Sequence, residues 1–237
     1  MLKEAIEKIE AMSGPKVFEA DGRTYIVGND GDAIPVTDEH WRPETLKLNS
    51  LDALVKMVKG DCPMPVFVSV KAHDRVSVYS AMTQDLRFER NVLYVADATD
   101  IPGWDPEVHL PFDQASVALM TRFQDGGDRE YTLLLLSQIT TGAKVTYTDN
   151  GIASTIVTQK GAALAENTTI RPLVKLRPYR TFQEVEQPEG IFLIRISERG
   201  ITFTEADGGM WKLTARNTVK NWLQEQFKDL DGITVML

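Results

Sequence analysis

Alternating apolar and polar residues dominate the chain from Gly142 onward and restrict it to folds rich in β-sheet. In AKVTYTDNGIASTIVTQKG, the dipeptide Asn150-Gly151 separates two alternating runs, and Asn-Gly favours the tight turn of a β-hairpin. TTIRPLVKLRPYRTF extends the alternation, GIFLIRISERGITFTEA predicts a further hairpin, and GITVML predicts a closing strand. Before that strand, a helix is indicated by apolar residues that share one face: Val219, Trp222, Leu223 and Phe227.

Residues 1–140 mix hairpins with helices. KVFEADGRTYIVG and PVFVSVKAHDRVSVYSA predict hairpins that turn at Asp21-Gly22 and His73-Asp74, and NVLYVADAT predicts a strand. Spacing and capping residues predict four helices: over 2–12, from an Asn49 or Ser50 N-cap to Gly60, from Asp113 to about Phe123, and from Asp128 to about Thr140. Because strands and helices do not alternate as βαβ units, we predict an α+β fold, mainly an antiparallel sheet built from hairpins with a few packed helices.

These patterns divide the chain into three parts. Residues 1–111 form a mixed half with hairpins, residues 112–140 a helical pair, and residues 141–237 an antiparallel sheet with a C-terminal helix. A chain of this length also suits a single domain, so both organisations stay open.

Composition excludes several classes of protein. The chain has no run of about 18 apolar residues, so we expect no membrane partner. Cys62 is the only cysteine, which rules out an intrachain disulfide and predicts a reducing, cytoplasmic location. The histidines, His40, His73 and His109, lack the spacing of zinc sites, and no nucleophile elbow or phosphate-binding glycine loop is present. We therefore expect no metal, no cofactor and no enzymatic activity.

Acidic residues offer a weaker case for metal chemistry. DATDIPGWDPEVHLPFD carries several carboxylates along one loop-rich stretch, and such oxygen ligands can hold Mg²⁺ or Ca²⁺. The spacing matches no known ion-binding loop, and acids are common in solvated connections. A divalent-metal hydrolase built on residues 97–113 or on Glu184 and Glu186 is therefore a minor alternative.

The charge is uneven along the chain. Net charge is −8, but residues 1–140 hold 14 basic against 23 acidic residues, whereas residues 141–228 hold 12 against 9. Within that second part, residues 167–182 carry four basic side chains and no acid. An acidic protein repels nucleic acid at long range, so a nucleic-acid or nucleotide contact would have to use this segment. Its candidate ligand-binding residues are Arg171, Lys175, Arg177, Tyr179 and Arg180.

The stretch LRPYRTFQEVEQPEGIFLIRI, residues 176–196, concentrates arginine, proline and aromatic residues. Pro178 and Pro188 favour extended backbone in the residues before them, which predicts a stiff extended run. Strand alternation then places Arg180 inward, in an ion pair with Glu184 or Glu186, and Arg177 outward. The segment is therefore either a ligand site or a well-anchored strut.

RPYRTFQEVEQPEGIFLIRI and the later FTEADGGMWKLTARNTVKNWL resemble the C-terminal part of an uncharacterised phage and prophage family typified by YfdQ. The likeness takes in NGIASTIVTQKG and LDALVKMVK and so covers most of the chain loosely. It implies a phage or prophage origin and the host cytoplasm, and it supplies no catalytic residues.

The most economical hypothesis is a non-enzymatic, phage-derived protein that assembles with copies of itself. Several predicted hairpins leave sheet edges that a partner chain would cover. The alternatives are a nucleic-acid- or nucleotide-binding protein that uses residues 167–182, and the metal hydrolase.

Overall fold

The computed structural model describes residues 3–5, 16–20, 23–27, 31–36, 44–82, 89–103, 105, 107–141, 144–149, 154–160, 163–169, 171–197 and 200–237. Contacts within the chain form two compact units, residues 1–43 and 44–237. The expected boundaries, after residues 111 and 140, lie inside the second unit.

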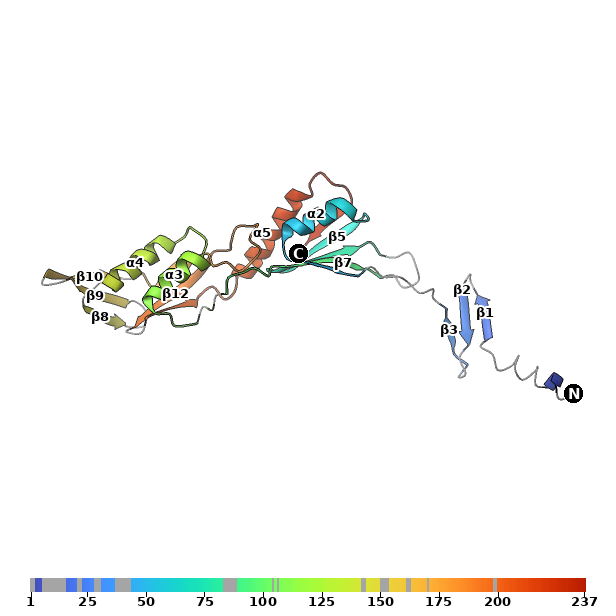
Figure 1. The fold of residues 1–237 in the computed structure, drawn as a ribbon, viewed down its shortest axis with the longest axis horizontal. Coiled ribbons are helices and arrows are strands. Elements are labelled where there is room, and N and C mark those ends of the chain that lie inside the picture. The colour runs from blue at the N-terminus through green and yellow to red at the C-terminus, as the bar shows by residue number, and fades with distance from the viewer. Residues whose placement is uncertain are drawn as a thin grey trace. The chain divides into compact units, whose positions relative to one another are not determined.

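The first unit holds a three-stranded antiparallel sheet, in the order β1-β2-β3 (Figure 1). Its strands are β1 (Lys16–Ala20), β2 (Arg23–Val27) and β3 (Ala33–Pro35). The predicted hairpin between β1 and β2 is confirmed by their antiparallel register, in which Phe18 lies opposite Tyr25. The turn at Asp21-Gly22 and most of the helix expected over 2–12 lie outside the described residues, of which only 3–5 are helical there.

The second unit contains a five-stranded sheet in the order β14-β5-β6-β7-β4. Its strands are β4 (Leu46–Leu48), β5 (Val66–Ala72), β6 (Arg75–Ser80), β7 (Val92–Asp97) and β14 (Ile233–Met236). The β5–β6 hairpin turns at His73-Asp74 as predicted, because alternating valines on both sides set an antiparallel register. The edge strands β4 and β14 pair in parallel with β7 and β5.

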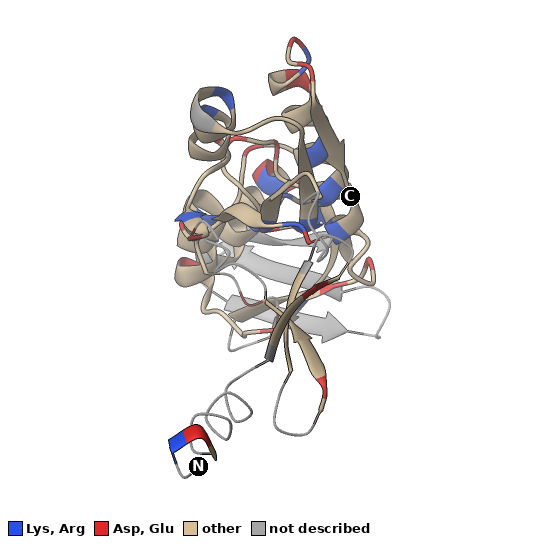
Figure 2. Cartoon of the chain, turned by 90° about the vertical axis from the view of Figure 1, so that its right-hand side faces the viewer, with Lys and Arg blue, Asp and Glu red and all other residues tan. Residues whose placement is uncertain are grey.

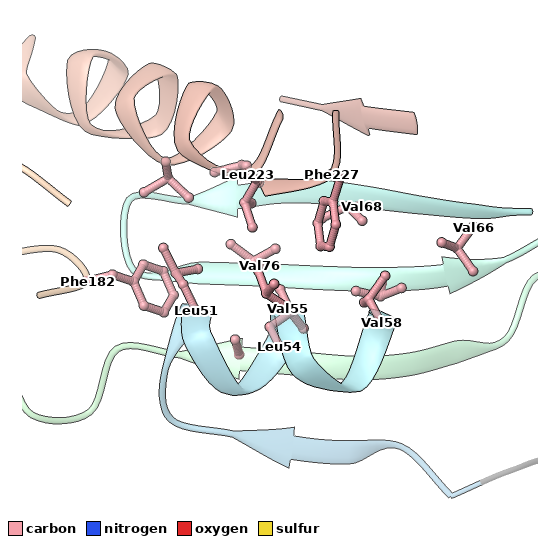
Figure 3. Close-up of a cluster of buried hydrophobic side chains, with 14 of the residues drawn as sticks. Leu51, Leu54, Val55, Val58, Val66, Val68, Val76, Phe182, Leu223 and Phe227 are labelled. Carbon is pink, nitrogen blue, oxygen red and sulfur yellow. The ribbon is translucent and has the colours of Figure 1, made fainter. Parts of the chain in front are cut away.

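Helices α2 (Leu51–Asp61) and α5 (Trp211–Gln226) pack on this sheet (Figure 1). Ser50 is the N-cap of α2, since its hydroxyl accepts from the backbone N–H of Ala53, and the helix ends one residue after Gly60. Figure 3 shows α2 lying against the strands with its apolar side chains turned toward them. The core it closes is made of aliphatic and aromatic side chains: Leu51, Leu54, Val58, Val68, Val76, Phe182, Leu223 and Phe227.

A second core lies between two helices and a three-stranded antiparallel sheet. The helices are α3 (Phe112–Arg122) and α4 (Arg129–Thr141), and the sheet order is β11 (Leu173–Leu176), β12 (Gly190–Ser197), β13 (Gly200–Glu205). The predicted 190–205 hairpin is confirmed by the pairing of β12 with β13. Asp113 is not the N-cap of α3: the cap position is Pro111, and Asp113 lies in the first turn, where a negative charge favours the helix dipole.

Strands β8 (Lys144–Asp149), β9 (Ser154–Lys160) and β10 (Ala163–Thr169) form a further antiparallel sheet. The hairpin between β8 and β9 is confirmed by its register, although the Asn150-Gly151 turn lies outside the described residues. The protein is thus α+β with mostly antiparallel sheets, as the sequence predicts. One prediction of packing is wrong: the C-terminal helix α5 packs on β5 and β14, not on the sheet of residues 141–205.

Candidate functional site

The predicted site residues lie just before β11, within it, and in the connection from β11 to β12. Residues 177–189 of this connection contain no strand, so the expected extended run is wrong. Instead, Gln187, which is 2% exposed, folds its amide back onto the backbone. Its Oε1 accepts from the N–H groups of Arg180 and Thr181, and its Nε2 donates to the carbonyl groups of Phe182 and Val185. A side chain thus satisfies backbone groups that a neighbouring strand would otherwise pair.

Arg171 and Lys175 are both matched with acids. The Nη2 of Arg171 lies 3.0 Å from Oδ1 of Asp128, and its guanidinium carbon lies 4.1 Å from the centroid of the Tyr131 ring. The Nζ of Lys175 lies 3.4 Å from Glu189, while its backbone N–H donates to Oδ2 of Asp128 over 2.9 Å. Asp128 immediately precedes α4, so it fastens that helix to β11.

Arg177 and Tyr179 are held by neighbouring elements. Arg177 pairs with Glu186 and lies 3.6 Å from Glu189, with its side chain 28% exposed. The N–H of Tyr179 donates to the carbonyl of Arg122 at the end of α3. The Tyr179 side chain is half-buried.

Arg180 is the most buried of the predicted cations. Its side chain is 11% exposed and pairs with Glu205 of β13, so the expected pairing with Glu184 or Glu186 is wrong. Burial lowers the pKa of Arg180 to about 10, against the opposing charges of Glu205 and Asp207, so the side chain stays cationic at neutral pH. Glu184 has another role: its Oε1 accepts from the backbone N–H groups of Leu51, over 2.7 Å, and Asp52 at the start of α2.

An aromatic cluster surrounds Arg180. The guanidinium carbon lies 3.8 Å from the ring centroid of Trp211, and the His73 ring meets Trp211 edge-on at 4.7 Å. The hydroxyl of Thr181 donates to the carbonyl of His73. Burial lowers the pKa of His73, with Lys212 and Arg180 acting in the same direction and Asp74 opposing them. These contacts hold the cluster together as a structural joint, in which the Thr181 hydroxyl is bound to the His73 carbonyl.

Sequence reasoning missed His73, Gln187, Glu205 and Trp211, which complete this joint. They come from segments that are distant along the chain or carry no distinctive local spacing, so no motif could have grouped them. The joint links both cores, because Phe182 and Val185 are buried against the five-stranded sheet while Pro178 forms a β-bridge with Phe123 of the second core. These contacts anchor the segment between the two cores.

In the acidic stretch over residues 97–113, Asp97 and His109 contact side chains from distant parts of the sequence. Asp97 binds the guanidinium of Arg75, and the two ring nitrogens of His109 lie 2.8 Å from Thr202 and 3.1 Å from Ser197. Within the described ranges, no group of three His, Cys, Asp or Glu side chains is placed to hold a metal ion. His40 and Trp104 lie outside those ranges.

The first unit presents an exposed apolar surface. Val17, Ile26 and Ile34 lie side by side across β1, β2 and β3, because each is the register partner of the next. Their side chains are 60%, 36% and 59% exposed. Val36, 44% exposed, continues this face beyond β3, where its N–H donates to the carbonyl of Thr24. We call these four residues the aliphatic face.

Comparisons of the chain with protein families, with curated proteins and with solved structures found no match. Among the described helices, none has the length and apolar character needed to cross a membrane.

Proposed function

We propose that the protein is a non-enzymatic, phage-derived structural protein that assembles with copies of itself in the host cytoplasm. The observation that carries this proposal is the aliphatic face of the N-terminal sheet. Its four β-branched side chains lie exposed on one side of three short strands. The likeness of RPYRTFQEVEQPEGIFLIRI to a phage family supports the origin, and the single Cys62 fits a reducing compartment.

A sheet of this size gains little stability unless its apolar side is covered. Small sheets are marginal without packing against a further layer, and fully burying a valine or isoleucine contributes about 1.5–3 kcal/mol. The opposite side carries the stacked rings of Phe18 and Tyr25, whose centroids lie 5.3 Å apart. Covering the aliphatic face would therefore stabilise the first unit as well as join two molecules.

A second copy of the chain is the occupant that the face fits best. Besides its apolar side chains, this side of the strands carries only Thr24 and Glu19. The surface can therefore meet an identical surface across a two-fold axis without bringing clusters of like charge together. The edge strand β1 also has unpaired backbone groups on its outer side among the described strands, which a second copy can pair.

Sedimentation velocity of the full chain at micromolar concentration tests the proposal. We expect a mass at least twice 26.5 kDa. Ile34→Lys should lower it toward the monomer, because it buries a charge in the interface. Ala33→Lys is the matched control, since Ala33 is also exposed but faces the other side of β3. A monomeric wild-type protein, or equal effects of both lysines, would refute assembly through this face.

Nucleic-acid binding through residues 167–182 is the weaker proposal. The described cations of that segment are paired with acids, and Arg180 is nearly buried. Hydrolysis is weaker still, because Glu184 binds backbone N–H groups and Glu186 binds Arg177.

A further inference from the structure

One face of the five-stranded sheet carries no helix in the part of the chain that the structure describes. Helices α2 and α5 both lie on the other face (Figures 1 and 3). On β5, Val66, Val68 and Val70 point to the helices, so the intervening residues point away. Register shows which residues share this outer face: Phe67 is opposite Tyr79, and Ser69 is opposite Ser77. We call it the open face.

The open face is hollowed. Side chains from four places in the chain line a depression of about 340 Å³: Phe67, Ser69, Lys71, Tyr79, Arg90 and Met236. Met236 lies on β14 beside Ser69, so the hollow spans the three neighbouring strands β14, β5 and β6. Ser69 and Ser77, 6% and 5% exposed, lie low between longer side chains. The result is a shallow trough with small residues between aromatic and basic ones.

A cationic side chain lies over each aromatic ring of the trough. The Nζ of Lys71 lies 5.0 Å from the centroid of the Tyr79 ring, and the guanidinium carbon of Arg90 lies 4.2 Å from that of Phe67. Lys71 and Arg90 are exposed, and both rings are partly accessible. These contacts hold basic groups beside π-faces that a planar ligand can reach once the cations move.

These cations differ from those of the β11–β12 connection in having no acid partner. Lys71, Arg90 and also Lys47 make no ion pair with a described acid. Lys47 is aligned with Val95 on β7, which places it on the open face at the opposite sheet edge from Met236. Arg75 is the exception, since Asp97 binds it. Figure 2 shows the Lys and Arg positions of the described chain in blue and the Asp and Glu positions in red.

We propose that the open face binds single-stranded nucleic acid, with bases stacked on Phe67 and Tyr79 and phosphates bound by Lys47, Lys71 and Arg90. Stacking of a base on an aromatic ring is worth more than an exposed cation–π contact, so a base can displace Lys71 or Arg90 from the ring. The displaced cation then lies beside the stacked base, where the phosphate of the same nucleotide needs a positive partner.

The geometry favours a single strand over a duplex. Two rings on adjacent strands of the open face can meet unpaired bases, whereas the bases of a duplex are already stacked on one another. The net charge of −8 repels nucleic acid at a distance, so binding rests on this local site and weakens steeply with salt. The inference is independent of self-assembly, because the aliphatic face lies in the other unit.

Fluorescence anisotropy with labelled oligothymidylate and oligouridylate of about 15 nucleotides tests the proposal on the full chain. We expect both probes to bind at low salt and a matched duplex to bind more weakly. Tyr79→Leu removes a stacking ring and should weaken binding about 5- to 150-fold, whereas Tyr79→Phe keeps the ring and should bind like the wild type. Circular dichroism and the mass by sedimentation establish that each variant keeps its fold and assembly.

The basic residues are tested by salt dependence. Lys71→Gln should reduce the slope of log affinity against log salt by about 0.7, the contribution of one phosphate contact on a single strand. Arg195→Gln is the matched control, because Arg195 is exposed on β12, away from this sheet. The proposal is overturned if neither probe binds, or if Tyr79→Leu binds like Tyr79→Phe. It is also overturned if Tyr79→Leu changes the mass of the assembly, which would make the open face an interface between copies.

Discussion

The guanidinium of Arg180 lies 3.8 Å from the ring centroid of Trp211, the first residue of α5. Arg180 belongs to the connection that follows β11, whereas α5 packs on the five-stranded sheet. The same guanidinium pairs with Glu205 at the end of β13. One buried cation therefore ties together the elements of both cores in the second unit.

This arrangement predicts unequal effects of two neighbouring arginines. Arg180→Ala should lower the free energy of unfolding by about 3–5 kcal/mol, because it strands Glu205 and removes the contact with Trp211. Arg177→Ala should cost at most about 1 kcal/mol, since Glu186, its partner, is 67% exposed. Urea denaturation measures both values, and equal midpoints for the two variants would contradict the assignment of Arg180 as the joint.

Gln187 provides a second test of the joint. Gln187→Ala leaves the N–H groups of Arg180 and Thr181 without their acceptor, and each buried unsatisfied group costs about 1–3 kcal/mol. We expect a loss of at least about 2 kcal/mol in urea denaturation. Gln183→Ala is the control, because Gln183 is exposed and donates one hydrogen bond to Asp100. Similar losses for the two variants would show that the backbone of 180–187 is held by something else.

Local patterns in the sequence predict local structure well in this chain. The His73-Asp74 hairpin, the Ser50 cap and the β12–β13 hairpin all follow from residues within a few positions of one another. Asp113 fails as a cap for a local reason too, because the N-cap position of α3 is Pro111, two residues earlier. A shift of two residues is beyond what capping preferences can resolve.

The site could not be predicted because its contacts join distant segments. Nothing near Arg180 in the sequence distinguishes Glu205 from the closer Glu184 and Glu186 as its partner. Alternation identifies two faces on β5 but does not say which is covered, since that depends on where α5 returns. The prediction of an extended run is wrong because the Gln187 side chain bonds backbone groups that strand pairing would use. A single buried amide leaves no periodic signal in the sequence.

The start of α2 is stabilised by two groups from different parts of the chain. Ser50→Ala should cost about 1 kcal/mol by removing the acceptor for the N–H of Ala53. Glu184→Gln keeps an oxygen but removes a negative charge from the helix N-terminus, so it should cost about 0.3–1 kcal/mol. Thermal melting in low and high salt distinguishes the two contributions, because the loss of stability caused by Glu184→Gln should become smaller as salt is added. If the Ser50 effect shrinks equally, charge rather than capping would explain both.

Burial of His73 predicts a dependence of stability on pH. The pKa of His73 is lowered in the folded protein, first by burial and then by Lys212 and Arg180, against Asp74. The unfolded chain therefore binds more protons as the pH falls through about 6.5, and stability is lost toward the lower folded pKa. The melting temperature of His73→Gln should fall less than that of the wild type between about pH 7 and pH 5. His109→Gln is the control, and a wild-type-like slope in His73→Gln would contradict the prediction.

Two glycines with similar backbone angles should respond differently to alanine. Gly127 and Gly208 have φ of +59° and +63°, a conformation that costs an alanine roughly 1–2 kcal/mol. At Gly208 a Cβ meets nothing within 4 Å, so Gly208→Ala should cost only that amount. At Gly127 a Cβ would lie 2.4 Å from the carbonyl oxygen of Lys175.

That carbonyl accepts the N–H of Asp128 over 2.7 Å, so the Cβ would displace β11 from the start of α4. Loss of this hydrogen bond adds about 0.5–1.5 kcal/mol to the backbone strain, before any loss of packing between α4 and β11. Gly127→Ala should therefore be less stable than Gly208→Ala by at least about 1 kcal/mol in urea denaturation. Equal stability of the two variants would mean that the start of α4 and β11 lie farther apart than the 2.4 Å contact between that Cβ and the Lys175 carbonyl oxygen implies.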